Sequence, residues 1–240
     1  MPDAIFELPR LAELYDPLDP DRSDLDAYAD LVEEFGAASV VDIGCGTGTF
    51  ACLLAMKDLD VIGVDPAAAS LEVARRKRGA DRVRWLHGDA TSLPPLAVRM
   101  VTMTGNVAQV FLTDEEWATT LRAAGRALQR GGRLVFEVRD PSRRAWQAWN
   151  REQSLATVHV PEVGNVDHWV QVTDVTGQLV SFTSTFDIDG EILTSNSTLR
   201  FRERGEIEAS LRTADFRLLD VRDAPDRPGL EFVFVAERSD

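Results

Sequence analysis

Cysteine is scarce in this chain, with two in 240 residues. Two thiols cannot form the set of disulfide bonds that holds small secreted domains together, and so few thiols are typical of a reducing compartment. The chain also lacks a basic segment followed by an apolar stretch after Met1, so we predict no secretory signal. No apolar run approaches the ~18 residues of a membrane span. We therefore expect a cytoplasmic protein without a membrane partner.

Positive charge is in the minority. The chain has 26 Lys and Arg against 40 Asp and Glu, which gives a net charge of -14. Such a charge repels polyphosphate at long range, so we expect no nucleic-acid partner. The remaining composition, 44% hydrophobic and 28% charged, is that of an ordinary globular protein. The length and the absence of internal repeats fit a single domain at residues 1–240.

Changes in hydrophobic period divide the chain. A Pro- and Asp-rich arm at residues 1–22 precedes a helix that runs from Ser23 to a glycine cap at Gly36. Short apolar strands then alternate with helices, which is typical of a parallel sheet covered on both faces. We predict strands at 40–43, 60–64, 83–86, 98–103 and 134–138, and helices from about 50, at 68–77 and at 113–128.

After Pro141 the pattern changes to period two. An Asp189-Gly190 pair between two long Ser- and Thr-rich segments is a strong hairpin signal. We predict strands at 169–175, 179–188 and 192–201, then a helix at 206–214 and strands at 216–221 and 230–235. The chain is therefore expected to have an arm and helix at 1–35, a core at about 36–150 and 203–240, and an inserted antiparallel β lobe at about 155–202.

The richest chemical signal is Asp42-Ile43-Gly44-Cys45-Gly46-Thr47-Gly48, at the end of the first predicted strand. Glycines permit a positive φ and close backbone approach, and the amides at the start of the next helix attract an anion. A tight strand-to-helix turn alone would need fewer glycines than these three, so a ligand-binding loop is favoured. Asp65 ends the second strand, where a carboxylate can accept both ribose hydroxyls or cap a helix. Thr49 stands where a dinucleotide fingerprint needs a third glycine, which argues against a nicotinamide cofactor.

Together with Gly88-Asp89-Ala90 after the third strand, these motifs resemble class I S-adenosylmethionine-dependent methyltransferases over most of residues 36–140 and at the end of the chain. The resemblance implies a Rossmann-like α/β fold, a doubly wound, mostly parallel seven-stranded sheet. It also implies that the glycine loop receives the methionine part of S-adenosyl-L-methionine, that Asp65 holds the ribose, and that Asp89 with the Ala90 amide recognises adenine. The cofactor contacts it predicts are Asp42, Gly44, Cys45, Gly46, Gly48, Asp65, Pro66, Gly88, Asp89, Ala90 and Asn106.

The segment from Thr104 to Phe111 follows the fourth strand and faces the place where the methyl group would leave. It lacks the Asn-Pro-Pro-aromatic motif of family members that methylate exocyclic amines in nucleic acids. In small-molecule members the arm and the insert often roof the pocket. We therefore expect substrate contacts from Tyr15, Gln109, His168 and Trp169, although a polar helix start at Gln109 and packing roles for His168 and Trp169 are alternatives.

Methyl transfer from a sulfonium is an in-line displacement, so the protein has mainly to position the reactants. No protein nucleophile or metal is required, and Cys45 and Cys52 with no nearby histidine do not make a metal site. No residue is identified as catalytic, and candidates for a base are His159, His168, Glu162, Asp167 and Tyr15. We predict a methyltransferase acting on an oxygen or nitrogen of a small molecule, as a monomer or homodimer. The alternatives are a module that binds S-adenosylmethionine or S-adenosylhomocysteine without catalysis, and a nicotinamide oxidoreductase.

Overall fold

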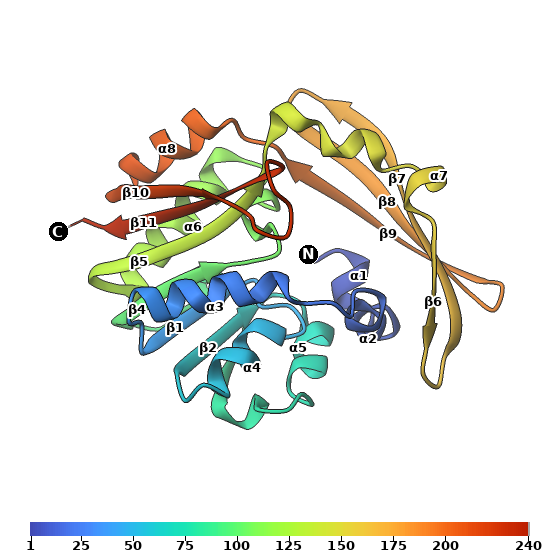
Figure 1. Ribbon diagram of the computed structural model, residues 1–240, viewed down its shortest axis with the longest axis horizontal. Coiled ribbons are helices and arrows are strands. Elements are labelled where there is room, and N and C mark those ends of the chain that lie inside the picture. Colours follow the sequence, from blue (N-terminus) through green and yellow to red (C-terminus); the bar gives the residue numbers. More distant parts are fainter. Residues whose placement is uncertain (240) are drawn as a thin grey trace.

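The computed structural model describes residues 1–239 and contains a large and a small β-sheet (Figure 1). The large sheet has seven strands in the order β10-β11-β5-β4-β1-β2-β3. Only β11 runs against its neighbours, so the predicted doubly wound, mostly parallel sheet is confirmed. Its strands are β1 (Ser39–Ile43), β2 (Asp60–Asp65), β3 (Val83–His87), β4 (Val98–Met103), β5 (Leu128–Arg139), β10 (Phe216–Asp223) and β11 (Glu231–Arg238).

Helices cover both faces of the large sheet, because each helix has one apolar side to bury. Residues of α6 and α8 pack on one face around Trp117 and Phe136, and residues of α3 and α4 pack on the other around Tyr28 and Phe50. A capping box of Thr113 and Glu116 begins α6. The covering elements are α3 (Asp24–Glu34), α4 (Thr49–Ala55), α5 (Ala68–Ala74), α6 (Asp114–Ala127) and α8 (Arg204–Thr213), with short 3-10 turns η1 (Ala80–Arg82), η2 (Ala90–Ser92) and η3 (Val107–Gln109).

The small sheet is the predicted antiparallel lobe, with strands in the order β6-β7-β8-β9. Asp189 and Gly190 both have positive φ, at 53° and 88°, which is the backbone that a two-residue hairpin with an Asp-Gly turn requires. The strands are β6 (Ala156–Val160), β7 (Gly164–Thr176), β8 (Leu179–Ile188) and β9 (Glu191–Arg200), and three short helical segments connect β5 to them: η4 (Pro141–Arg143), η5 (Ala145–Ala148) and α7 (Arg151–Ser154).

The N-terminal arm bridges the core and the lobe (Figure 1). It consists of α1 (Ala4–Glu7) and α2 (Pro9–Leu18). Leu11 and Leu14 of α2 pack with apolar side chains of β6, β7 and β8, and the Ile5 amide donates to the Ser195 hydroxyl on β9 at 2.9 Å. The arm therefore contacts the lobe both through packed side chains and through a backbone amide.

Several predicted boundaries were wrong. We did not predict helices in the arm, because its Pro and Asp content is typical of a loop. Pro9 nevertheless occupies the first turn of α2, where a missing N–H costs nothing. The helix predicted at 68–77 ends at Ala74. Strand β5 begins at Leu128 rather than at 134, and β6 was not predicted because it is short and lies at a sheet edge.

Within residues 1–239, no helix combines the length and the apolar character needed to cross a bilayer.

The packing of the arm predicts a large loss of stability for Leu14→Ala. The Leu14 side chain is 2% exposed in a cluster shared with the lobe, and cavity-forming Leu→Ala changes cost about 2–5 kcal/mol. Urea unfolding should show a decrease in that range. Leu155→Ala, at a leucine that is 46% exposed, is the control and should change the free energy of unfolding by less than about 1 kcal/mol.

Candidate functional site

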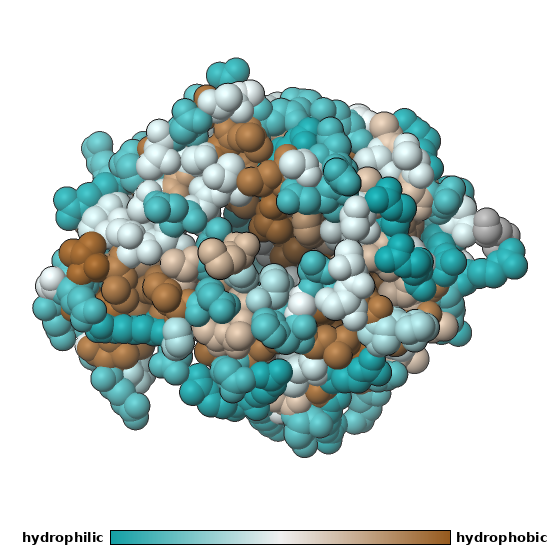
Figure 2. All heavy atoms as spheres, turned by 180° about the vertical axis from the view of Figure 1, so that it is seen from behind, coloured by the Kyte–Doolittle hydropathy of each residue, from teal (hydrophilic) through white to brown (hydrophobic). Residues whose placement is uncertain are grey.

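A cavity of about 1290 Å³ lies at the carboxyl ends of the parallel strands. The loops that follow β1, β2, β3 and β4 form one side, and the arm, α6 and strands β8 and β9 close the other. The neighbours of β1 are β2 and β4, so the cavity lies at the switch point where open α/β sheets bind ligands. Seen from behind, the molecule has a hollow near its centre with hydrophobic side chains around it (Figure 2). The volume exceeds the ~300–1,000 Å³ of most ligand pockets, which leaves room for two small molecules.

The glycine loop after β1 forms part of the cavity wall. Gly44, Gly46 and Gly48 have φ values of 70°, 53° and 77°, in the left-handed region that favours glycine. A Cβ on Gly44 would lie 2.6 Å from the Val107 side chain, whereas a Cβ on Gly46 would meet no atom within 4 Å. The backbone at Gly46 is therefore open toward the cavity, where a ligand can approach it closely.

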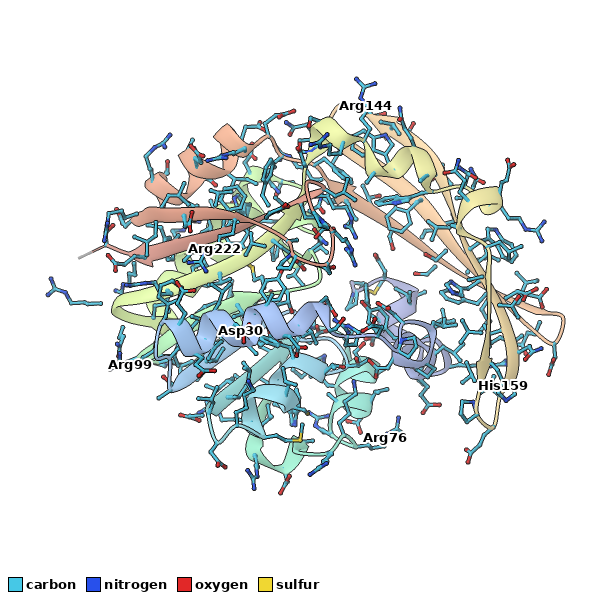
Figure 3. The ribbon with its side chains drawn as sticks, in the orientation of Figure 1. Asp30, Arg76, Arg99, Arg144, His159 and Arg222 are labelled. Carbon is cyan, nitrogen blue, oxygen red and sulfur yellow. The ribbon has the colours of Figure 1, made fainter. Side chains whose placement is uncertain are left out.

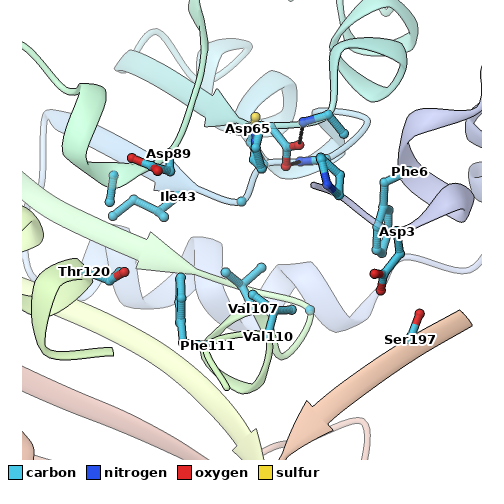
Figure 4. Close-up of a pocket in the computed structure, with 18 of the residues that line it drawn as sticks. Asp3, Phe6, Ile43, Asp65, Asp89, Val107, Val110, Phe111, Thr120 and Ser197 are labelled. Atoms are coloured by element: carbon cyan, nitrogen blue, oxygen red, sulfur yellow. Dashed lines mark hydrogen bonds between the residues drawn. The ribbon is translucent and has the colours of Figure 1, made fainter. Parts of the chain in front are cut away.

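Asp65 ties this loop to the end of β2. Its Oδ2 accepts a hydrogen bond from the Gly46 amide at 2.8 Å, and its Oδ1 accepts one from the Ala67 amide at 2.7 Å (Figure 4). Burial raises the pKa of Asp65, and the two amide donors act in the opposite direction. Each carboxylate oxygen has a further lone pair, so Asp65 can also accept from hydroxyl groups of a ligand.

Asp89 follows β3, which lies beside β2 at the edge of the large sheet (Figure 4). Its Oδ1 accepts from the amide and the hydroxyl of Thr91, at 2.7 and 2.5 Å, which caps η2. Its Oδ2 makes no hydrogen bond within residues 1–239 and is free to accept one from a ligand. The cavity therefore has a separate carboxylate at each of two strand ends.

Asp42 lies beneath the glycine loop and is 1% exposed. Its Oδ1 accepts from the Thr102 hydroxyl at 2.8 Å. Burial, together with the nearby charge of Asp65, raises the pKa of Asp42 to about 7. This carboxyl group therefore titrates close to neutral pH.

Most of the predicted contacts line this one cavity. They are Tyr15, Asp42, Gly44, Cys45, Gly46, Asp65, Pro66, Gly88, Asp89 and Ala90. Gly48 and Asn106 do not line it. Asn106 is 3% exposed, and its Nδ2 donates to the Glu231 carboxylate at 3.3 Å.

Three predicted substrate contacts lie elsewhere. The Gln109 side chain is buried, and its Oε1 accepts from the Arg139 guanidinium at 3.1 Å. His168 stacks against Phe186, and the Arg151 guanidinium covers Trp169 at 4.7 Å. His168 and Trp169 are successive residues of β7, so their side chains lie on opposite faces of the lobe. The structure brings none of the three to the cavity wall.

Among the candidates for a base, Tyr15 alone lines the cavity. His159 is exposed on the lobe (Figure 3). Among residues 1–239, no three His, Cys, Asp or Glu side chains come together in a group that could hold a metal ion.

Several residues that line the cavity were not predicted as individual contacts from the sequence. Phe6 and Asp3 come from the arm, Phe111 from the segment after η3, and Phe182 and Ser197 from the lobe. Phe6, Asp3 and Ser197 face one another across the far side of the cavity from Asp89 (Figure 4). The family resemblance led us to expect the arm and the insert over the pocket, with Tyr15 in contact, but it did not single out these residues.

A second group of contacts fastens the arm to the glycine loop. The Asp16 Oδ2 on α2 pairs with Lys77 Nζ at 2.6 Å, and its Oδ1 accepts from the Thr47 hydroxyl at 2.7 Å. The Ala68 amide at the start of α5 donates to the Glu7 carboxylate at 2.9 Å. The arm is therefore held directly over the loops that line the cavity.

Comparison with known proteins points to one family. Residues 40–132 match the family described as "Methyltransferase domain". The cypemycin N-terminal methyltransferase of a Streptomyces species is 32% identical over 105 residues, which cover 43% of each chain. The chain spans about half the length of the curated relatives it matches.

Solved structures share the fold over nearly the whole chain. An S-adenosylmethionine-dependent methyltransferase from Clostridium acetobutylicum has a TM-score of 0.79 at 18% identity, with 96% of this chain and 98% of that one covered. CalS10, an amino pentose methyltransferase from Micromonospora echinaspora with S-adenosylmethionine bound, has a TM-score of 0.71 at 23% identity, with 95% of both chains covered.

The raised pKa of Asp42 predicts a specific pH dependence of stability. The folded state holds the proton more tightly than the unfolded state, so this contribution is complete at acid pH and is lost as the pH rises through about 7. Asp42→Asn keeps the acceptor for Thr102 and removes the titration. Relative to wild type, the variant should gain about 2 kcal/mol of unfolding free energy between about pH 5 and about pH 8, as measured with urea.

The matched control is Asp30→Asn, which changes an exposed carboxylate on α3 (Figure 3). This variant should not reproduce the rise in relative stability that we expect of Asp42→Asn. The same pH profile for Asp42→Asn and Asp30→Asn would contradict the assignment of the titration to Asp42.

Proposed function

We propose that this chain, which belongs through residues 40–132 to the class I S-adenosylmethionine-dependent methyltransferase family, transfers a methyl group from S-adenosylmethionine to an oxygen or nitrogen atom of a small molecule. One observation carries the proposal. The left-handed glycine loop, Asp65 and Asp89 converge on a single cavity that has room for a second molecule.

The residues of the cavity fit the parts of the cofactor one by one. The open backbone at Gly46 would hold the amino-acid tail, Asp65 would accept from the ribose hydroxyls, and the free Oδ2 of Asp89 would accept from the adenine amino group. Cys45, Pro66, Gly88 and Ala90 line the same path. Asp42 would act from beneath the loop, where its carboxyl group accepts a hydrogen bond from Thr102 on β4.

When bound, S-adenosylmethionine supplies a methyl group that its sulfonium already activates for in-line displacement. The chain has then to hold the acceptor in line and to exclude water, and correct positioning can account for about 7–11 kcal/mol of a barrier. The arm would exclude water, because Asp16 and Glu7 fasten it over the glycine loop and the start of α5.

The acceptor would occupy the side of the cavity formed by the arm, the segment after β4 and the lobe. Aromatic rings and hydroxyl groups dominate there, in Phe6, Tyr15, Phe111, Phe182 and Ser197. Arg22 is the one basic residue among the described lining residues, and it pairs with Asp24 at 3.1 Å. A neutral or basic acceptor therefore fits better than an anionic one. The names of the cypemycin and amino pentose methyltransferases, which both refer to amine-bearing substrates, support the same class.

Of the four residues predicted to contact the substrate, Tyr15 is the one that lines the cavity, and we keep it as the proposed contact. Burial raises the pKa of its hydroxyl, so the group keeps its proton at neutral pH. Tyr15 would therefore donate a hydrogen bond to the acceptor rather than remove a proton from it. An amine acceptor would have to bind in its neutral form or lose its proton to solvent.

A module that binds the cofactor without catalysis remains the second candidate. The observation in its favour is that no histidine lines the cavity among the described residues. Incubation with S-adenosylmethionine that carries a labelled methyl group and a panel of small amines and alcohols separates the two. We expect label in an acceptor together with an equal amount of S-adenosylhomocysteine. Cofactor binding without release of label on any acceptor would favour the module.

The role of Asp65 predicts weaker cofactor binding in Asp65→Asn. Hydrogen bonds to charged groups contribute about 1.5–3 kcal/mol, so the affinity for S-adenosylhomocysteine should fall by about 10- to 100-fold in calorimetry. Asp60→Asn, at the exposed start of the same strand, is the control and should bind like wild type. Equal affinities for the two variants would contradict the assignment of the ribose site to Asp65.

A further inference from the structure

A buried carboxylate behind the cavity holds the segment that follows β4. Glu137 on β5 is 6% exposed, and its Oε1 accepts from the Gly105 amide at 2.5 Å and from the Asn106 amide at 3.1 Å. Its Oε2 accepts from the hydroxyl of Tyr28 on α3. Successive amides that converge on one oxygen form an anion-binding nest, which is filled here by a side chain of the same protein.

The segment that Glu137 holds has an unfavourable backbone. Gly105 and Asn106 are successive left-handed residues, with φ of 69° and 61°, and an asparagine there is strained. In addition, Asn106 Oδ1 is buried without a hydrogen-bond partner in the described part of the chain. Such features persist where the surroundings enforce them, and they cluster at functional sites.

The same segment forms the cavity wall next to the glycine loop. Thr104, Gly105 and Val107 line the cavity. Val107 packs so closely on Gly44 that a Cβ at Gly44 would lie 2.6 Å from its Cγ2. Movement of the two amides would therefore move the wall that faces the tail of a ligand in the glycine loop.

We propose that Glu137 is a positioning residue for the transfer reaction: by holding the Gly105 and Asn106 amides, it fixes Thr104 and Val107 beside the cofactor. This inference rests on the proposed function, because it assigns the wall to the methyl-bearing end of that ligand. Glu137 itself touches neither reactant, since it does not line the cavity.

The ionisation of Glu137 can be followed through the amides that it binds. Burial and the charge of Glu231 on β11 raise the pKa of Glu137 to about 7, and the Gly105 and Asn106 amides and the cation of Arg227 oppose that rise. Tyr28 on α3 and Arg139 on β5 are the other titratable or charged groups that face it. An amide proton bonded to a carboxylate resonates further downfield than one bonded to a neutral acid. The Gly105 resonance should therefore report the state of Glu137.

The test uses amide NMR spectra of the ¹⁵N-labelled full chain over a pH series, with and without saturating S-adenosylhomocysteine. In the wild type, we expect the Gly105 resonance to move downfield as the pH rises, in one titration, and the ligand to shift its midpoint. Glu137→Gln preserves the acceptor oxygen and should abolish the titration. Tyr28→Phe removes a donor to the carboxylate and should shift the midpoint to higher pH.

Calorimetry with S-adenosylhomocysteine supplies the functional readout. Glu137→Gln should bind within about twofold of the wild type, whereas Glu137→Ala, which leaves both amides unsatisfied, should bind about tenfold more weakly. Glu137→Gln and Tyr28→Phe keep the core filled. Their spectra therefore test the proposal even if Glu137→Ala fails to fold.

A Gly105 resonance that is the same in the wild type and in Glu137→Gln across the pH series, or a titration that the ligand leaves unchanged while still binding to the wild type, would overturn the role of Glu137 and leave the proposed function standing. Wild-type affinity in Glu137→Ala would have the same meaning. Failure of the wild type itself to bind S-adenosylhomocysteine would contradict the proposed function and this inference together.

Discussion

The site is built around the carboxylate of Asp65, which joins two loops that the fold brings to the same sheet edge. Its oxygens accept the amides of Gly46 and Ala67, one from the loop after β1 and one from the loop after β2. The left-handed glycines let the first loop approach close enough for this contact. Because the same oxygens can accept further hydrogen bonds, the group that organises the two loops is also the one that we propose for the ribose.

Three distant parts of the chain then enclose the space above these loops. The arm reaches the glycine loop through Asp16 and the lobe through Leu11 and Leu14. The lobe contributes Phe182 and Ser197 to the wall, and the segment after β4 contributes Val107. Under the proposed function, the loops at the strand ends of the large sheet would hold the cofactor, and the arm and the insert would hold the acceptor.

The sequence predicted the sheet correctly, and most of the residues that it offered for a cofactor line one cavity, for a physical reason. Apolar strands, a glycine-rich turn and an Asp after a buried strand are local patterns whose geometry the chain dictates within a few residues, as at Gly44, Gly46 and Asp65. The acceptor side depends on contacts between residues far apart in sequence. Phe6 and Asp3 were missed because only tertiary packing carries the arm to the cavity. Gln109 was placed in the substrate site because a polar residue after β4 looks available, whereas Arg139 holds its side chain in the interior.

A crystal structure of the protein soaked with S-adenosylhomocysteine tests the central claim most directly. We expect the ribose hydroxyls to lie within hydrogen-bond distance of Asp65, the adenine to lie beside Asp89, and the sulfur to lie between the glycine loop and Val107. Density for the ligand at another place, or a cavity that stays empty at saturating concentration, would contradict it.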